Sequence, residues 1–214
     1  MQMKKDIPIR YIIFDLSEVL LTGAKDTGIA LREKHQIEVK GPKMDWAQEK
    51  HPLLTSLVKE FFHGTIGEDE YIKDVIEMYP MIGETEWLKD HIRENFKEVE
   101  GTRDIVLRLR ALGYRLALFS NHAKEWIDYC ERKFNFHELF DVRVYSYEIG
   151  RSKPDPLSFQ AVLKQLKAGP EECLFIDDSE INVEAAGKLG IRGIVFTTAD
   201  NLRSRLEDIL PDFA

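Results

Sequence analysis

The stretch that decides the fold is Tyr11-Ile12-Ile13-Phe14-Asp15, a short apolar run that ends at a carboxylate. Short apolar runs rich in β-branched and aromatic residues are typical of strands buried on both faces, as in a parallel sheet. Four further runs have the same character, and three of them also end at a polar residue. They are residues 116–119 before Ser120, 142–145, 173–176 before Asp177, and 193–196 before Thr197.

Helical patterns separate these runs. Apolar residues recur at helical spacing over 102–112, 156–166 and 182–189, and Gly113 and Gly190 stop the first and the last pattern. Alternating strands and helices predict the α/β class, here a Rossmann-like sheet of parallel strands. Ligands of such sheets bind beyond the carboxyl ends of the strands, so the polar residues that follow the runs are the candidate site.

The segment from about residue 20 to residue 100 contains no convincing strand. Amphipathic helical patterns cover 53–62, 71–79 and 87–96, and a weaker one covers 25–36. We predict that residues 20–100 form an all-helical cap domain, a lid above the strand ends. The cap is then an insertion into an α/β core made of residues 1–19 and 101–214.

Charge and composition exclude several classes of protein. Thirty basic and 38 acidic residues give a net charge of −8, which disfavours nucleic acid and anionic membrane surfaces as partners. Two cysteines cannot make a disulfide framework, and no apolar run reaches the ~20 residues of a membrane span. No apolar segment follows the charged start, so we expect no signal peptide. We predict a cytoplasmic monomer or homodimer with no nucleic-acid or membrane partner.

Acidic residues follow two of the predicted strands: Asp15 after the first, and the pair Asp177-Asp178 at the end of another. An aspartate after a strand is often only a cap or a turn former. Carboxylates that meet at one sheet edge repel each other unless a cation lies between them or one is protonated. Mg²⁺ takes carboxylates, waters and phosphate oxygens as ligands. The acidic residues therefore predict a Mg²⁺ site that would attract a phosphate group.

Two further features add positive charge and hydrogen-bond donors. Lys153 precedes Pro154-Asp155-Pro156, where the prolines stiffen the chain and a fixed ammonium would hold a phosphate or two carboxylates. A lone lysine is otherwise usually solvated. Ser120-Asn121 offers hydroxyl and amide donors at an expected helix start, which suits an anion, although an ordinary N-cap has the same residues.

These pieces occur in an order that resembles the four motifs of the haloacid dehalogenase superfamily. The motifs are Phe14-Asp15-Leu16-Ser17-Glu18-Val19, Ser120-Asn121, Lys153-Pro154 and Asp177-Asp178. Each is weak alone, but four in order at strand ends are a specific signal. The resemblance covers nearly the whole chain, since one subclass carries a helical cap between the first two motifs. It is strongest to sugar-phosphate phosphatases of the glucose-1-phosphate type, and it implies Mg²⁺-dependent hydrolysis of a small phosphorylated metabolite.

The resemblance implies catalytic and substrate-binding roles for five residues. Asp15, ionised near neutrality, would be the nucleophile that forms an aspartyl-phosphate. Ser120, the neighbouring amide of Asn121 and Ser17 would contact the phosphate. Lys153 would neutralise charge on Asp15 and on the phosphoryl group.

It also implies a set of metal ligands. Asp178 would bind Mg²⁺ directly and Asp177 would assist, while Asp15 and the backbone carbonyl of Ser17 would complete the protein ligands. Asn182, four residues beyond Asp178, would steady the surroundings of the metal.

Ser17 departs from the family pattern. Phosphatases of the family usually carry an aspartate there as the general acid, which typically contributes 10²–10⁴-fold to the rate. Three alternatives follow. The enzyme manages without that acid on a good leaving group; or Glu18, His122 (expected in the first turn of a helix) or a cap residue such as those of the 63–65 loop replaces it; or the chain is a non-catalytic phosphate-binding sensor.

Dehalogenation is a further alternative. It would use Asp15 on carbon and needs no metal, but the acidic pair Asp177-Asp178 argues against it.

Overall fold

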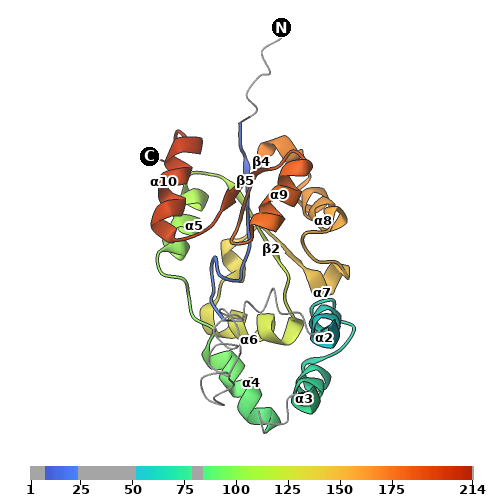
Figure 1. Cartoon of the computed structure of the whole chain (residues 1–214). Coiled ribbons are helices and arrows are strands. Elements are labelled where there is room, and N and C mark those ends of the chain that lie inside the picture. Colours follow the sequence, from blue (N-terminus) through green and yellow to red (C-terminus); the bar gives the residue numbers. More distant parts are fainter. Residues whose placement is uncertain (1–7, 24–51, 79–83, 214) are drawn as a thin grey trace, which may run out of the picture.

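Five parallel strands form the centre of the molecule (Figure 1). Their order in the sheet is β3-β2-β1-β4-β5. The computed structural model describes residues 8–23, 52–78 and 84–213. The strands are β1 (Tyr11–Phe14), β2 (Arg115–Ser120), β3 (Val142–Tyr145), β4 (Cys173–Asp177) and β5 (Arg192–Val195). All four pairings are parallel. The predicted α/β fold is confirmed, and β5 begins one residue earlier than expected.

The strand order places β1 between β2 and β4. Phe14, its last residue, lies opposite Leu118 of β2 and Ile176 of β4. The backbone amide of Asp15 continues the pairing by donating to the carbonyl of Ile176, at 2.9 Å. The residues that follow these three strands therefore meet at one edge of the sheet, where ligands of α/β folds bind.

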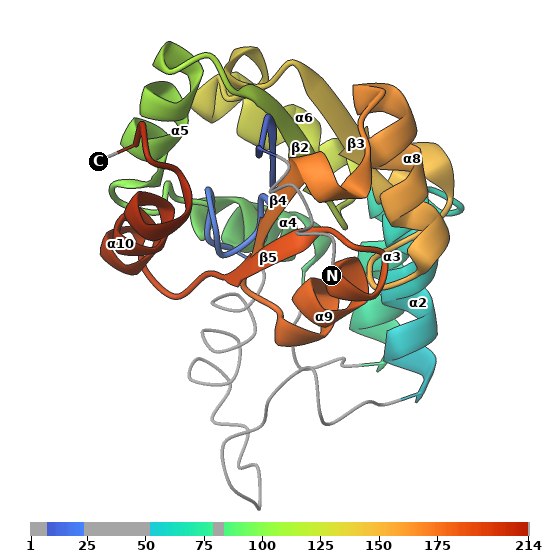
Figure 2. The same cartoon turned by 90° about the horizontal axis from the view of Figure 1, so that it is seen from above.

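Helices cover both faces of the sheet. They are α5 (Thr102–Ala111), α6 (Lys124–Phe134), α7 (Ser146–Ile149), α8 (Pro156–Leu166), α9 (Glu180–Lys188) and α10 (Ala199–Ile209), with short 3₁₀ turns at His137–Leu139 and Pro170–Glu172. Ile12 and Phe14 belong to the core that contains α5, α6 and α10, whereas Ile13 belongs to the core with α8 and α9. Figure 2 shows α5 and α10 on one side and α8 and α9 on the other.

Three helices of the expected cap lie beyond the carboxyl ends of the strands (Figure 1). They are α2 (Pro52–Phe62), α3 (Glu68–Met78) and α4 (Thr85–Glu94), close to the predicted helical patterns. The two connections to the core run side by side, since Val99 N donates to Leu20 O and Thr22 N to Lys97 O. The expected helix at 25–36 lies outside the described residues, and the domain boundaries stay a prediction.

The junction between β2 and α6 differs from our expectation. The helix begins at Lys124 with Ala123 as its N-cap residue, so the helix start predicted at Ser120-Asn121 is wrong. His122 likewise precedes the helix instead of lying in its first turn. Tertiary hydrogen bonds explain the delay, because the Asn121 side chain bonds to the Lys153 backbone and His122 N bonds to Ser146 Oγ.

Our sequence reasoning also missed α10. Its signals are Thr198, whose hydroxyl caps the helix by accepting from Asn201 N, and Leu202 and Leu206 at helical spacing. Among the described residues, no helix has the length and apolar character that crossing a membrane requires. The expected oligomeric state and cytoplasmic location stay predictions.

Candidate active site

Asp15 is the first residue beyond β1 and is buried, with 6% of its surface exposed. Its Oδ1 accepts a hydrogen bond from the backbone amide of Leu16 at 2.7 Å. The chain then turns tightly, because the amides of Leu20 and Leu21 both donate to the carbonyl of Leu16. The turn fixes the carboxylate of Asp15 at the edge of the sheet, and Ser17 lies half-buried within it.

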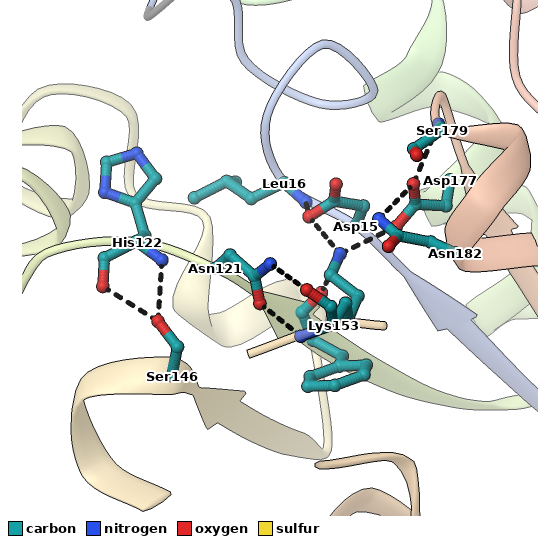
Figure 3. A network of polar contacts seen from close by, with 10 residues as sticks. Asp15, Leu16, Asn121, His122, Ser146, Lys153, Asp177, Ser179 and Asn182 are labelled. Carbon is teal, nitrogen blue, oxygen red and sulfur yellow. Dashed lines mark hydrogen bonds and ion pairs between the residues drawn. The ribbon is translucent and has the colours of Figure 1, made fainter. Parts of the chain in front are cut away.

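Lys153 reaches into the same edge from the loop before α8 (Figure 3). Its Nζ lies 2.8 Å from Asp15 Oδ1 and 2.7 Å from Asp177 Oδ2, and it donates to the carbonyl of Phe119 at 3.0 Å. These three acceptors match the three donors of an ammonium group. The lysine is buried and fixed between two carboxylates, which excludes the solvated alternative.

Asn121 holds the backbone of Lys153 at both of its polar groups. Asn121 Oδ1 accepts from Lys153 N at 2.9 Å, and Asn121 Nδ2 donates to Lys153 O at 3.0 Å (Figure 3). The side-chain amide that we expected to face an anion therefore orients the lysine. For Asn121, the predicted contact with phosphate now concerns only its backbone amide.

Asp177 ends β4 and is fully buried. Its Oδ1 accepts from Ser179 N at 2.9 Å and from Asn182 Nδ2 at 3.0 Å, while its Oδ2 faces Lys153. Asn182 thus orients Asp177, as Figure 3 shows. Because Asp177 is restrained on both oxygens, it sets the position of the ammonium group of Lys153.

The carboxylates fit a hard divalent cation. Asp15, Asp177 and Asp178 each offer an oxygen, and these atoms lie within 4.8 Å of one another. Burial raises the pKa of Asp15 to about 7; Lys153 opposes this shift, whereas the charges of Asp177 and Asp178 add to it. Three carboxylates with one ammonium leave excess negative charge. Oxygen ligands with excess negative charge are what Mg²⁺ takes in proteins.

Ser120 offers a hydrogen-bond donor at the same edge. It ends β2 and is fully buried, and its Oγ has no hydrogen-bond partner among the residues that the structure describes. A buried hydroxyl without a partner costs about 1–3 kcal/mol. An oxygen of a bound anion would provide the missing acceptor.

His122 does not fit the role of a replacement acid. It is 3% exposed and lies in an aromatic cluster, with its ring stacked on Phe62 and tilted against Phe96. Burial lowers its pKa to about 4, so the imidazole is neutral at neutral pH. In Figure 3 the ring points away from Asp15.

Sequence reasoning missed Ser146, which orders the surroundings of the site. Its Oγ accepts from His122 N at 3.0 Å and donates to the carbonyl of Phe62, the last residue of α2, at 2.5 Å. Ser146 is the first polar residue after the predicted strand 142–145, so the rule that identified Asp15 would have found it. The carbonyl of Phe119 and the amide of Ser179 belong to the backbone and leave no sequence signal.

A parallel sheet, an inserted set of helices and a buried lysine between aspartates at the strand ends define an α/β protein of the haloacid dehalogenase type. The family model of haloacid dehalogenase-like hydrolases matches residues 9–190. The chain belongs to this family and is a hydrolase of that type, as the motifs predicted.

Two relatives are similar to this chain over most of its length. Flavin mononucleotide hydrolase 1 of Arabidopsis thaliana is 29% identical over 160 residues, which are 75% of this chain and 63% of that protein. This chain therefore spans less than two thirds of that relative. Pyrophosphatase PpaX of Bacillus cereus is 25% identical over 205 residues, 96% of this chain and 91% of that protein.

Solved structures share the fold. A HAD-like hydrolase of Porphyromonas gingivalis matches with a TM-score of 0.76 at 24% identity, over 95% of this chain and 98% of that one. A HAD family enzyme of Bacteroides thetaiotaomicron, crystallised with magnesium and inorganic phosphate, matches with a TM-score of 0.71 at 24% identity, over 89% and 95%.

Proposed function

We propose that this chain is a Mg²⁺-dependent phosphatase that hydrolyses small phosphate monoesters through an aspartyl-phosphate on Asp15. The observation that carries the proposal is the cluster of Asp15, Asp177 and Asp178, with Lys153 bridging the first two. Similar proteins named as a flavin mononucleotide hydrolase and a pyrophosphatase support phosphate chemistry. The enzyme of similar fold that was crystallised with magnesium and inorganic phosphate supports Mg²⁺ as the cofactor.

Asp15, Asp178 and the carbonyl of Ser17 would hold Mg²⁺, with Asp177 beside them. The bound ion would neutralise charge on the phosphate and favour the ionised form of Asp15. Asp177 has a second duty, because its Oδ2 holds the ammonium of Lys153. Asn182 and the amide of Ser179 hold Asp177 in place, both beside the metal and against Lys153.

The protein residues divide the chemistry between them. Oδ1 of Asp15 accepts from Leu16 N and pairs with Lys153. These contacts hold the carboxylate in place, and one of its oxygens would attack phosphorus. The bond from phosphorus to the ester oxygen breaks as the new bond to Asp15 forms, and the leaving group takes a proton from water. A water then attacks phosphorus, the bond from phosphorus to the oxygen of Asp15 breaks, and the water gives up a proton to the solvent. Inorganic phosphate leaves and the carboxylate of Asp15 is restored. Ser120 would donate to a phosphoryl oxygen throughout, and the positive charge of Lys153 would offset the negative charge of the phosphoryl group.

The serine at position 17 limits the substrates. Without an aspartate there, the alkoxide of an alcohol with a high pKa would leave slowly, since general acid catalysis typically raises the rate about 10²–10⁴-fold. A leaving group that is stable as an anion needs less help. We therefore propose a sugar phosphorylated at C1, or another monoester with a good leaving group, as the substrate class.

Phosphate release from a panel of metabolites tests the proposal. The panel contains sugar 1-phosphates, sugar 6-phosphates, flavin mononucleotide and pyrophosphate, each with Mg²⁺ and with EDTA. We expect release from the sugar 1-phosphates that requires Mg²⁺ and disappears in Asp15→Asn, because an amide is not a nucleophile. Binding of the esters without release would establish the sensor alternative. Metal-independent chloride release from 2-chloropropionate would establish dehalogenation.

A further inference from the structure

The turn between α2 and α3 joins the expected cap to the loop that carries Lys153. His63 in this turn forms a hydrogen bond of 2.7 Å from Nε2 to Ser152 Oγ. The carbonyl of the preceding Phe62 accepts from Ser146 Oγ at the start of α7. Figure 1 shows the end of α2 beside α7. Two adjacent cap residues therefore bond to two different segments of the core.

The turn lies against α7 without spare room. Gly64 has a φ of +71°, and a Cβ on it would lie 3.1 Å from the carbonyl oxygen of Tyr147. Such a contact is tighter than most side chains make, and the positive φ also favours glycine, so both observations favour a glycine in this turn. The position of the neighbouring His63 is thereby fixed relative to the core.

Ser152 transmits this contact to the site. It directly precedes Lys153, whose backbone is held from the other side by Asn121. The ammonium of Lys153 must remain within hydrogen-bond distance of two carboxylates and one carbonyl. A displacement of about 1 Å at a catalytic group is enough to cost up to 10²-fold in rate.

His63 is suited to a lasting contact. It is half-buried, and burial together with the charges of Lys59 and Arg151 lowers its pKa. The imidazole is therefore neutral at neutral pH and bonds with the Ser152 hydroxyl as donor or acceptor.

We propose that His63 is a positioning residue: through Ser152 it fixes the loop from which Lys153 reaches Asp15 and Asp177. The cap turn then completes the geometry of the site without touching the reacting atoms. The expected effect of His63 on the rate rests on the proposed phosphatase function. Its effect on the position of Lys153 does not.

A spectroscopic test needs no turnover. The lysine ε-carbons are labelled with ¹³C, and the Lys153 signal is identified by its loss in Lys153→Met. We expect His63→Ala and Ser152→Ala to shift this signal in the same direction, and His63→Gln, which retains a donor in place of Nε2, to restore it. Thr65→Ala is the matched control, because among the described residues the hydrogen bonds of Thr65 go to Glu60 O of α2. A Lys153 signal unchanged in His63→Ala overturns the inference.

Kinetics test the consequence. We expect His63→Ala to lower kcat about tenfold with a smaller change in KM, and His63→Gln to recover most of the loss. Ser152→Ala should have the same effect, and the double variant should lose no more than either single one. The inference would be overturned if the two losses in kcat multiplied in the double variant, or if His63→Ala left kcat unchanged. An inactive wild type would instead overturn the proposed function and leave the spectroscopic test to decide.

Discussion

Lys153 shows how the surroundings of a side chain determine its role. Burial alone would favour the neutral amine, but ion pairs with Asp15 and Asp177 outweigh that effect and raise the pKa of Lys153 above its ordinary value. The charged form also donates to Phe119 O, so no donor of the ammonium is wasted. The resulting cluster is held together by opposite charges that are individually costly to bury.

Removal of the ammonium should therefore expose this cost. Lys153→Met keeps the volume of the side chain but leaves the carboxylates of Asp15 and Asp177 buried beside each other. We expect a loss of about 3–5 kcal/mol in the free energy of unfolding, measured with urea in the presence of EDTA. Lys164→Met, on the exposed surface of α8, should change it by no more than about 0.5 kcal/mol. Equal losses in the two variants would show that Lys153 is not held by buried charges.

At the scale of elements, the junction between β2 and α6 buries the titratable ring of His122 where the first turn of a helix was expected. His122 contacts Phe62 of α2 and Trp126 of α6, so α2 and α6 share one aromatic cluster. Its pKa falls from 6.5 to about 4 on folding because of burial. The folded state thus binds the proton less readily than the unfolded chain.

This shift predicts a loss of stability in acid. His122 takes up a proton below about pH 6.5 in the unfolded chain, but only below about pH 4 in the folded chain. The free energy of unfolding therefore falls as the pH falls through this window. Between pH 7 and pH 5 we expect a loss of about 2 kcal/mol from His122. Urea unfolding at the two pH values measures it. His122→Asn should show a pH dependence weaker by that amount, and an identical dependence in both proteins would contradict the buried, neutral ring.

The same junction marks the limit of prediction from sequence. Strand runs such as residues 11–14 were predictable because burial on both faces leaves a continuous apolar pattern. The edge position of Asp15 and Asp177 followed from those strands. The delayed start of α6 did not, because hydrogen bonds from Asn121 and His122 to distant segments override the local capping preference. Partners of Lys153 that are backbone atoms were likewise beyond any residue pattern.

At the scale of the whole molecule, a net charge of −8 and a phosphate site are compatible. Three of the acidic residues gather at one sheet edge, where Lys153 and a divalent cation would compensate them locally. Net charge governs long-range attraction, whereas binding at this edge depends on charges within a few ångströms. The overall composition therefore argues against nucleic acid more strongly than against a small phosphorylated ligand.

The same gathering of charge predicts that Mg²⁺ stabilises the entire fold, since an ion that binds only the folded state shifts the unfolding equilibrium. At a Mg²⁺ concentration 100 times its Kd, we expect about 2.7 kcal/mol of added stability, seen as a rise in Tm that EDTA reverses. Asp178→Asn should fold, because this side chain is only half-buried, yet lose most of the rise. Asp200→Asn, on the exposed first turn of α10, is the control and should keep it. If Mg²⁺ raises the Tm of Asp178→Asn as much as that of the wild type, the ion binds elsewhere and the acidic cluster is not its site.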